Sequence, residues 1–420
     1  MAKFIIQGGV KLSGEVKVAG NKNSALKLMV ASLLGDSPTT LFNVPQIRDV
    51  ETMAQLIEGL GAKVTFEGEG VVKIDPTNLN SWQLDWELMG KIRASVVLAA
   101  PLVMRFGKVS LPKPGGDSVG ERLIDTHISM LTAYGAKCNR DYKGYEITAE
   151  KLKPADIFLE EASVTATEMA LMVASCIPGE TVIEGAAAEP HIVDLAEMLI
   201  KMGAKINGAG TNTVRVLGVI KLRGVEHKVR PDHIEVGTFA VAAAITGGDV
   251  YIKDSIPEDL KIILAYLGKM GVEYEFSAKD ELRIRPSELI AKQRVFKTRP
   301  WPGFPTDLIS QFIVLSTQTR GIVLCHDWMY EWRIFFVDHL IKMGANIIIA
   351  DPHRVIVVGP SQLHGQLIPS PDIRAGGALV LAALSGRGES VVEHAEIVDR
   401  GYEKFEERLS FLGANIKRVE

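Results

Sequence analysis

Charged side chains stand at the starts of several helix-like stretches, where they could bind a multiply charged anion. In "LPKPGGDSVGERLID" (111–125), glycines precede Arg122, and an acid, Asp117, lies between them. A glycine-rich loop before a helix lets backbone N–H groups face an anion, so an acid is unexpected there. Either this loop only reverses the chain, or Asp117 takes part in chemistry.

A lysine stands at the start of the helix expected from "VAGNKNSALK". Lys22 is unfavourable there, because a helix N-terminus carries partial positive charge and prefers anions. A bound anion would reverse this, since the dipole, the free N–H groups and the lysine would all attract it. The alternative is that Lys22 is a solvated linker charge and Asn23 only the N-cap. The stretch alone leaves both interpretations open.

Three more polar residues accompany apolar helical stretches. Arg93 leads "KIRASVVLAAPLV" and is either a phosphate ligand or a surface charge with its aliphatic stem packed down. His127, in "ERLIDTH", has a packed or capping role as its simpler interpretation and a catalytic base as its alternative. Asp307 follows the proline-rich loop of "WPGFPTDLISQF", where an N-cap is the simpler interpretation.

Arginines recur in the second half of the chain. "MYEWRIFF" places Glu331 and Arg333 beside aromatic residues, where an ion pair within the chain is a sufficient structural reason. "SPDIRAGGALV" presents Arg374, and "IVDRGYEKFEERL" presents Arg400, each ahead of a helical stretch. Planar guanidinium groups suit bidentate binding of carboxylate and phosphate. Together these residues predict a cleft with several cations and a few carboxylates, suited to chemistry on an anion.

A repeat of about 70 residues, present six times, must position these side chains. In each copy an amphipathic stretch leads to a Gly-Ala or Gly-Val pair, whose glycine stands at 61, 135, 203, 271, 344 and 413. The apolar spacing predicts a helix that the glycine ends in a left-handed conformation. Alternating segments after it predict a hairpin, and a helix and a strand precede it. Each repeat is thus helix, strand, helix, strand, strand; repetition for stability alone is the alternative.

The sixth repeat is short, because only "ANIKRVE" follows its glycine. Residues 3–17 match the strand endings of other repeats, so we expect the N-terminal segment to supply the missing strands. This predicts two domains of three repeats each. One spans 21–229 and carries the glycine-rich loop, and the other is discontinuous and combines 1–20 with 230–420. Two similar domains joined by two crossings of the chain favour an active site in the cleft between them.

The composition narrows the class of protein. With 420 residues, 47% of them hydrophobic, the chain can bury more than one core. A formal net charge of -4 argues against a nucleic-acid partner bound through overall basicity. The three cysteines are far apart, so neither a zinc site nor a disulfide framework is indicated. We find no signal-peptide pattern and no apolar run of about 18 residues, so we expect a cytoplasmic protein without a membrane partner.

Six motifs resemble the UDP-N-acetylglucosamine 1-carboxyvinyltransferases, a family of enolpyruvyl transferases. They are "GNKNSALKLM", "RASVVLAAPLVMRFG", "PGGDSVGERLIDTHI", "FPTDLISQF", "DIRAGGALVLA" and "DRGYEKFEERLSFLGANI". The resemblance implies an α/β class fold, the two-domain inside-out α/β barrel. It implies transfer of the enolpyruvyl group of phosphoenolpyruvate to the 3-hydroxyl of UDP-N-acetylglucosamine (UDP-GlcNAc), the first committed step of peptidoglycan synthesis. The family works by addition and elimination through a tetrahedral ketal, with no metal or organic cofactor.

The resemblance also implies roles for single residues. The catalytic residues would be Lys22, Asp117, Asp307 and Arg400, with Asp307 as base for the 3-hydroxyl. Phosphoenolpyruvate would be held by Lys22, Asn23, Arg122, Arg333, Arg374 and Arg400. UDP-GlcNAc would be contacted by Asn23, Arg93, Arg122, His127, Ser163, Val164, Asp307 and Met329. Supporting groups would be Asp49 and Glu331.

Four positions depart from the family pattern. A cysteine is usual at Asp117, a lysine is common at Glu161, a glycine is common at Thr165, and a histidine occurs at Ile397. Glu161 and Thr165 motivate one alternative, an enolpyruvyl transferase for another acceptor such as shikimate 3-phosphate. A second alternative is a catalytically silent paralogue that binds the nucleotide sugar and regulates a partner.

Asp117 has a consequence for inhibition. In the family the thiol of this loop takes part in proton transfer and is alkylated by the epoxide antibiotic fosfomycin. A carboxylic acid carries a proton when burial raises its pKa, although Arg122 and Lys22 act in the opposite direction. A carboxylate does not form the stable thioether that a cysteine forms. We therefore expect Asp117 to be the general acid and the enzyme to be insensitive to fosfomycin.

Overall fold

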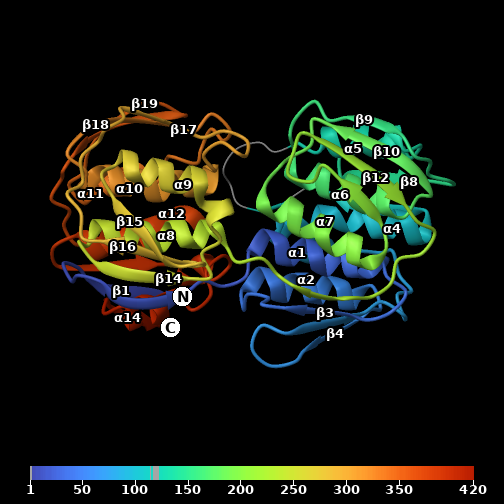
Figure 1. The fold of residues 1–420 in the computed structure, drawn as a ribbon, viewed down its shortest axis with the longest axis horizontal. Helices are drawn as coiled ribbons and strands as arrows, with labels where there is room; N and C mark the ends of the chain where they lie inside the picture. The colour runs from blue at the N-terminus through green and yellow to red at the C-terminus, as the bar shows by residue number, and fades with distance from the viewer. Residues whose placement is uncertain (1, 114, 117–122) are drawn as a thin grey trace. The chain divides into compact units, whose positions relative to one another are not determined.

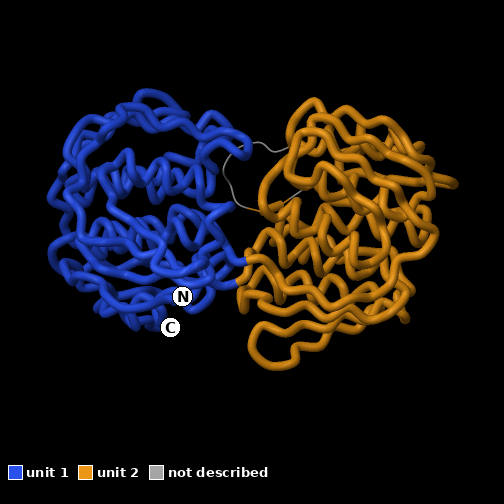
Figure 2. The backbone as a smooth tube through the Cα atoms, viewed as in Figure 1, with its two compact units in different colours: residues 1–19, 118–121, 231–420 blue, residues 20–117, 122–230 orange. Residues whose placement is uncertain are grey.

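The chain forms two compact units (Figure 2). The computed structural model describes residues 2–113, 115–116 and 123–420, so Asp117 and Arg122 lie outside the described residues. Unit 1 combines the residues up to Ala19 with Pro231–Glu420, and unit 2 consists of the described residues between Gly20 and Arg230.

Each unit contains three repeats in the predicted order of helix, strand, helix, strand, strand (Figure 1). The elements of unit 2 are α1 (Lys22–Ala31), η1 (Ser32–Leu34), β3 (Thr39–Phe42), α2 (Arg48–Gly59), β4 (Lys63–Phe66), β5 (Val72–Asp75), α3 (Trp86–Lys91), η2 (Arg93–Leu98), α4 (Ala99–Phe106), β6 (Lys108–Pro112), α5 (Asp125–Ala133), β7 (Lys137–Arg140), β8 (Gly144–Thr148), β9 (Asp156–Phe158), α6 (Val164–Ser175), β10 (Gly179–Glu184), α7 (Pro190–Met202), β11 (Lys205–Asn207), β12 (Thr213–Gly218) and β13 (Glu226–Lys228).

The elements of unit 1 are β1 (Lys3–Gln7), β2 (Ser13–Lys17), α8 (His233–Ile245), β14 (Asp249–Lys253), α9 (Pro257–Lys269), β15 (Glu273–Ala278), β16 (Glu281–Arg285), β17 (Val295–Lys297), η3 (Thr306–Leu308), α10 (Ile309–Gln318), β18 (Gly321–His326), α11 (Val337–Lys342), β19 (Asn346–Asp351), β20 (Arg354–Gly359), β21 (Leu367–Pro369), α12 (Ile373–Ser385), β22 (Glu389–Glu393), α13 (Ala395–Val398), α14 (Phe405–Phe411) and β23 (Asn415–Val419). The η elements are 3-10 helices.

The repeated glycine ends the second helix of each repeat, as predicted. All six of these glycines have positive φ angles, between 84° at Gly271 and 129° at Gly203. An L-residue with a Cβ is strained in this region of the backbone, which explains why glycine recurs at this one point. The chain then turns directly into the hairpin.

Each repeat builds a sheet, and among the described residues a parallel strand from another repeat extends every sheet except β6-β8-β7. In unit 2, β9 follows the hairpin of the second repeat and pairs with β10 of the third. The strand β13 follows the third repeat and returns to pair with β3 of the first. The sheet order is therefore β13-β3-β5-β4, and the three repeats of the unit close into a ring.

The N-terminal segment completes the last repeat, as expected. The strand β1 lies between β22 and β23 and is antiparallel to both, with Phe4 opposite Val392 on one side and Arg418 on the other. The second strand, β2, does not join this sheet. It pairs in parallel with β14 of the fourth repeat, because it is the strand that closes the ring of unit 1.

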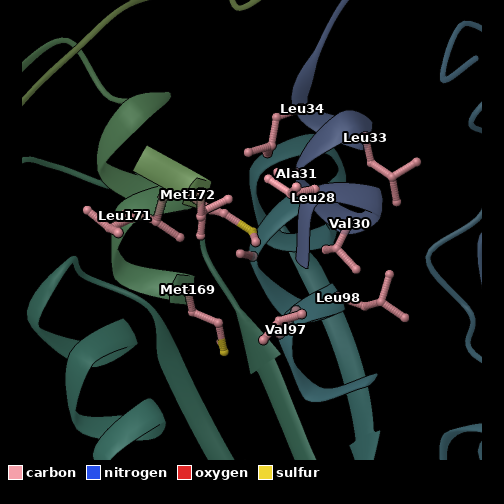
Figure 3. Close-up of a cluster of buried hydrophobic side chains, with 14 of the residues drawn as sticks. Leu28, Val30, Ala31, Leu33, Leu34, Val97, Leu98, Met169, Leu171 and Met172 are labelled. Atoms are coloured by element: carbon pink, nitrogen blue, oxygen red, sulfur yellow. The ribbon is translucent and has the colours of Figure 1, made fainter. Parts of the chain in front are cut away.

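The first helix of each repeat lies inside its unit and the sheets lie outside, which confirms the inside-out arrangement (Figure 1). In α8, 12 of 13 residues are buried. A helix that is apolar on every side can be stable only where other elements surround it. In unit 2, Leu28 of α1, Val97 of η2 and Met172 of α6 belong to one cluster of buried side chains (Figure 3).

One pair of charged residues interrupts this apolar interior. Lys27 of α1 and Glu168 of α6 are buried, and Lys27 Nζ lies 3.6 Å from Glu168 Oε2. That separation is too long for a good hydrogen bond. Burial raises the pKa of Glu168 to about 8, because the opposing effect of Lys27 is smaller.

We predict that Glu168 makes unit 2 less stable in mild alkali. The raised pKa means that the folded state holds this proton more tightly than the unfolded state, where the ordinary value is 4.5. Stability from this group is therefore present below pH 4.5 and is lost as the pH rises through 8. Linkage predicts a loss of about 2 kcal/mol in the free energy of unfolding between pH 6 and pH 8.

Urea unfolding of Glu168→Gln at both pH values should show that this loss has disappeared. The exposed Glu184→Gln substitution is the matched control and should keep the wild-type pH dependence. An unchanged pH dependence in Glu168→Gln would contradict the prediction.

Candidate functional site

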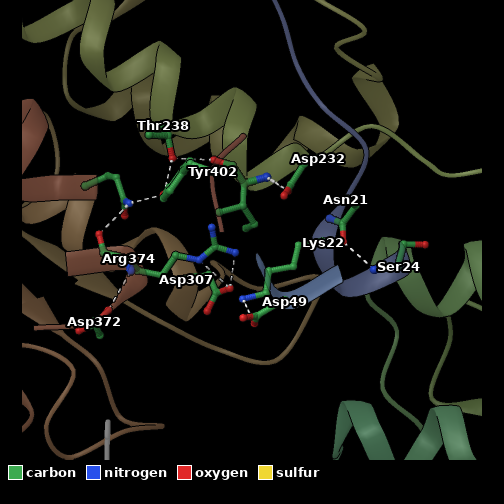
Figure 4. A network of polar contacts seen from close by, with 12 residues as sticks. Asn21, Lys22, Ser24, Asp49, Asp232, Thr238, Asp307, Asp372, Arg374 and Tyr402 are labelled. Atoms are coloured by element: carbon green, nitrogen blue, oxygen red, sulfur yellow. Dashed lines mark hydrogen bonds and ion pairs between the residues drawn. The ribbon is translucent and has the colours of Figure 1, made fainter. Parts of the chain in front are cut away.

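Lys22 is the first residue of α1, and its ammonium group is buried beside Asp49. Nζ lies 2.7 Å from Asp49 Oδ2, and the two side chains are 11% and 6% exposed (Figure 4). Asp49 stands in the first turn of α2, so a helix dipole and a lysine both stabilise its charge. The interpretation of Lys22 as a solvated linker charge is therefore wrong. An anion at the start of α1 would find N–H groups and a cation together.

The N-cap of α1 is Asn21, two residues earlier than the N-cap interpretation of Asn23 placed it. Its side-chain oxygen accepts a hydrogen bond from the Ser24 N–H at 2.9 Å. The interpretation of Asn23 as the cap is therefore wrong. Asn23 lies half-buried inside the first turn of α1, directly after Lys22.

His127 is buried in α5 and contacts the start of α6. Its Nε2 lies 2.7 Å from Thr165 Oγ1. Burial, together with the charge of Arg93, lowers the pKa of His127 to about 3. A neutral imidazole can exchange hydrogen bonds with a hydroxyl group but supplies no positive charge at pH 7. The packed interpretation of His127 holds, and Thr165 is its partner.

Arg93 and the first residues of α6 surround this contact in unit 2. Arg93 begins η2, and its Nη2 donates to the Leu123 carbonyl at 3.1 Å. Ser163 is the N-cap of α6, with its side chain accepting from the Ala166 N–H, and Val164 is the first residue of the helix. The structure thus brings four residues predicted to contact a nucleotide sugar onto three neighbouring elements, at Arg93, His127, Ser163 and Val164.

In unit 1 the Asp307 carboxylate bridges two buried arginines. Arg374 donates to Oδ2 from Nε at 3.1 Å and from Nη2 at 2.9 Å (Figure 4). Arg333 donates from Nη2 to Oδ1 at 3.4 Å. Asp307 lies in η3, where its side chain caps no helix, so the N-cap interpretation is wrong. The predicted ion pair of Arg333 is formed with Asp307.

The electrostatics of this triplet favour three charged groups. Burial lowers the pKa of both guanidinium groups, but Asp307 and the other acidic and tyrosine side chains around them together outweigh burial. The pKa of Arg374 and of Arg333 therefore lies above its usual value. The arginine side chains are about 5% exposed, whereas that of Asp307 is 25% exposed. Asp307 therefore combines two buried cationic partners with an accessible carboxylate edge that can accept a proton.

Three residues that the sequence reasoning missed hold Arg374 in place. The Asp372 carboxylate caps α12 and accepts from the Arg374 N–H at 2.8 Å. The Tyr402 ring lies 5.5 Å from the guanidinium carbon of Arg374. Gln311 donates to the Tyr402 hydroxyl at 3.0 Å and to the Arg374 carbonyl at 3.2 Å. Only Asp372 had a sequence signal, the Ser-Pro-Asp ahead of a helical pattern.

The remaining predicted residues of unit 1 lie on turns. Arg400 is half-buried and lies two residues after the end of α13, and Glu331 is exposed. The Met329 N–H donates to Asp327 Oδ1 at 3.0 Å, and Thr306 donates to the other oxygen of that carboxylate at 2.5 Å. Asp327 therefore ties the turn at Met329 to the residue before Asp307.

Neither a metal centre nor a membrane span is found in the described part of the chain. No group of three or more His, Cys, Asp or Glu side chains there is placed to hold a metal ion. Likewise, none of the described helices has the length and apolar character needed to cross a bilayer.

Comparison with known proteins gives one consistent picture. The sequence matches the EPSP synthase (3-phosphoshikimate 1-carboxyvinyltransferase) family over residues 6–409. It is 43% identical to a UDP-N-acetylglucosamine 1-carboxyvinyltransferase of Treponema denticola over the full length of both chains. It is 44% identical to that of Bradyrhizobium diazoefficiens, covering 99% of this chain and 98% of the relative.

Solved structures support the fold. The enolpyruvyl transferase NikO from Streptomyces tendae superposes with a TM-score of 0.89 at 24% identity, covering 100% of this chain and 99% of the other. EPSP synthase from Acinetobacter baumannii gives a TM-score of 0.74 at 19% identity over both full chains. The predicted α/β fold of the enolpyruvyl transferases is therefore confirmed.

We predict that buried His127 makes the protein less stable in mild acid. Its pKa is lower in the folded state than the ordinary 6.5, so its contribution is present above pH 6.5 and is lost as the pH falls toward 3. Linkage gives a loss of about 1 kcal/mol between pH 7 and pH 5.5. Unfolding of His127→Gln by urea at these two pH values should show a smaller loss than the wild type. Equal losses in both proteins would contradict the prediction.

Proposed function

Because the chain belongs to the EPSP synthase family, and within it to the UDP-N-acetylglucosamine 1-carboxyvinyltransferases, we propose that it transfers the enolpyruvyl group of phosphoenolpyruvate to the 3-hydroxyl of UDP-GlcNAc, with release of phosphate. This reaction is the first committed step of peptidoglycan synthesis. The observation that carries the proposal is the Asp307 carboxylate held by Arg374 and Arg333, which combines a base with cations for an anionic substrate.

In the addition step, Asp307 accepts the proton of the sugar 3-hydroxyl. The oxygen of that hydroxyl forms a bond to C2 of phosphoenolpyruvate. The double bond of phosphoenolpyruvate takes up a proton at C3, which becomes a methyl group. We propose Asp117 as the donor of that proton. The product is a tetrahedral ketal that carries the sugar oxygen, the phosphate, the carboxylate and the methyl group on one carbon.

In the elimination step, the ketal loses phosphate and a methyl proton. The C2–O bond to phosphate breaks, Asp117 takes back a proton from C3, and the double bond forms again in the product. The phosphate leaves with the proton that Asp307 had accepted, so both carboxyl groups return to their starting states. Lys22, Arg122 and Arg400 would stabilise the phosphate as its charge develops, because preorganised cations act strongly where water is excluded. Lys22 is already held at a helix N-terminus by Asp49.

A second acceptor has one observation in its favour. Thr165, where glycine is common in the family, occupies the hydrogen-bonding position opposite His127. If this contact changes the sugar-binding surface, the enzyme would use another hydroxyl acceptor such as shikimate 3-phosphate. The relatives at 43% and 44% identity favour UDP-GlcNAc.

We predict phosphate release from phosphoenolpyruvate with UDP-GlcNAc and none with shikimate 3-phosphate. In Asp307→Asn the amide cannot accept the hydroxyl proton, so kcat should fall by about 10²- to 10⁴-fold. Asp249→Asn, which removes the partner of Arg283 in unit 1, is the control and should keep wild-type kcat. Turnover with shikimate 3-phosphate alone would overturn the acceptor assignment. UDP-GlcNAc binding without any phosphate release would instead support the silent paralogue.

We also predict that fosfomycin does not inactivate the wild-type enzyme. The Asp117 carboxylate does not form the stable thioether to which the drug owes its effect on a cysteine. Asp117→Cys should lose activity with time in fosfomycin and gain the mass of one adduct on residue 117. Time-dependent inactivation of the wild type, with an adduct on Asp117, would refute the proposal.

A further inference from the structure

A buried carboxylate of unit 2, Asp194, lies outside every residue set considered so far. It belongs to α7 and is 2% exposed. Three groups from different parts of the chain donate hydrogen bonds to it. The Ser24 hydroxyl and the Arg230 N–H both bind Oδ2, the latter at 3.0 Å, and His227 Nε2 lies 2.7 Å from Oδ1.

The tautomer of His227 follows from its second contact. Lys201 Nζ lies 3.2 Å from His227 Nδ1. An ammonium group only donates hydrogen bonds, so Nδ1 must be the acceptor and Nε2 carries the proton. His227 therefore donates to Asp194, and Lys201 orients the ring. In the series Lys201, His227 and Asp194, each of the first two residues donates a hydrogen bond to the next.

These contacts do not form a nucleophilic triad. A serine nucleophile needs a histidine between it and the acid, so that the imidazole can take the hydroxyl proton. Here Ser24 and His227 both donate to Asp194, on opposite oxygens. The serine hydroxyl is used as a donor, and no base faces it among these contacts. The arrangement suits fixing positions rather than activating an oxygen.

Asp194 closes a ring of hydrogen bonds that also contains Ser24, Asn21 and Arg230. The Ser24 hydroxyl binds Asp194 directly. The Ser24 N–H is capped by Asn21 (Figure 4). The Asn21 N–H in turn donates to the Arg230 carbonyl at 2.7 Å, and the Arg230 N–H returns to Asp194. Lys22 and Asn23 lie between Asn21 and Ser24 in the sequence. The residues on either side of this pair are therefore both fixed by hydrogen bonds that lead to the Asp194 carboxylate.

We propose that Asp194 is a positioning residue for enolpyruvyl transfer, which fixes the first turn of α1 to the segment at Arg230 and so aims Lys22. His227, oriented by Lys201, keeps the carboxylate aligned. The inference rests on the proposed function, because it assumes that Lys22 acts on phosphoenolpyruvate. Small displacements of a charged group can lower the rate by up to about 100-fold, which is why a residue without substrate contact can matter.

The main test is Asp194→Asn, because the amide keeps the shape and loses an acceptor. Its NH₂ group must face either Ser24 and Arg230, which opens the ring, or His227, which removes the hydrogen bond that aligns the side chain. We expect kcat/KM for phosphoenolpyruvate to fall by about tenfold or more, with a smaller change for UDP-GlcNAc. Asp249→Asn is the matched control and should stay within about twofold of wild type, because its arginine partner lies in unit 1.

Two further variants separate positioning from general stability. His227→Gln offers a donor for Asp194 and an acceptor for Lys201, so it should restore most of the activity that His227→Phe loses. Ser24→Ala and Asp194→Asn should have non-additive effects on kcat/KM, because both open the same ring. If Asp194→Asn does not fold, Ser24→Ala and His227→Phe carry the test. Multiplicative losses would overturn the proposal.

Hydrogen exchange gives a readout that does not need activity. Asp194→Asn should speed exchange at the amides of Asn21, Ser24 and Arg230 by about tenfold, while helix amides in unit 1 keep their wild-type rates. If the wild-type protein shows no turnover but Asp194→Asn shows this exchange pattern, the proposed function is refuted and the structural role of the hydrogen-bonded ring is retained. If exchange is unchanged and the loss of kcat/KM in Asp194→Asn equals the fraction of the variant that is unfolded, the positioning role is refuted.

Discussion

An open sheet edge exposes unpaired N–H and C=O groups, and in most repeats of this fold a strand from another repeat covers one edge of the sheet. The shared strand is parallel to its neighbour and comes from the preceding repeat, as with β9 on β10. In each unit the last of the three repeats is followed by a strand that returns to the first. In unit 2 the returning strand is β13, and in unit 1 it is β2.

Ring closure also determines where the chain leaves each unit. The segments at Ala19 and Arg230 follow directly after β2 and β13. Each is held by a buried carboxylate through one backbone N–H. Asp194 accepts from Arg230 at 3.0 Å, and Glu235 accepts from Ala19 at 2.6 Å. Glu235 is in turn paired with Arg408. Lys22 comes three residues after Ala19, so its position depends on the contacts that fix the segments after β2 and β13.

The features read correctly from the sequence are those set by short-range constraints. Apolar spacing and a glycine with positive φ recur in every repeat, so the helices and their ends were predictable, and the matching strand ending identified β1. The errors concern polar partners. The N-cap interpretations of Asn23 and Asp307, each given beside a role in substrate binding, rested on the helical patterns that these residues precede. The true partner of Asp307 is Arg374, 67 positions away, and no local pattern specifies such a pair.

Burial was equally hard to infer for single charges. Lys22 follows a glycine-containing segment, which suggests exposure, yet Asp49 and the interior of unit 2 enclose it. Asp194 lies in an amphipathic helix where an acid normally faces water. Its three donors come from α1, β13 and the segment after β13. These segments meet only after β13 has returned to the first repeat of unit 2.

The central place of β1 in its sheet has a consequence for synthesis on the ribosome. Unit 2 is complete once residue 230 has emerged, and β2 can pair as soon as β14 is made. The neighbours of β1, however, are β22 and β23, which are translated at the far end of the chain. At about 5–20 residues per second, β1 waits for roughly 20–80 s without its partners. The strand that is made first is therefore among the last to be paired, and its polar backbone must be kept from other chains throughout that interval.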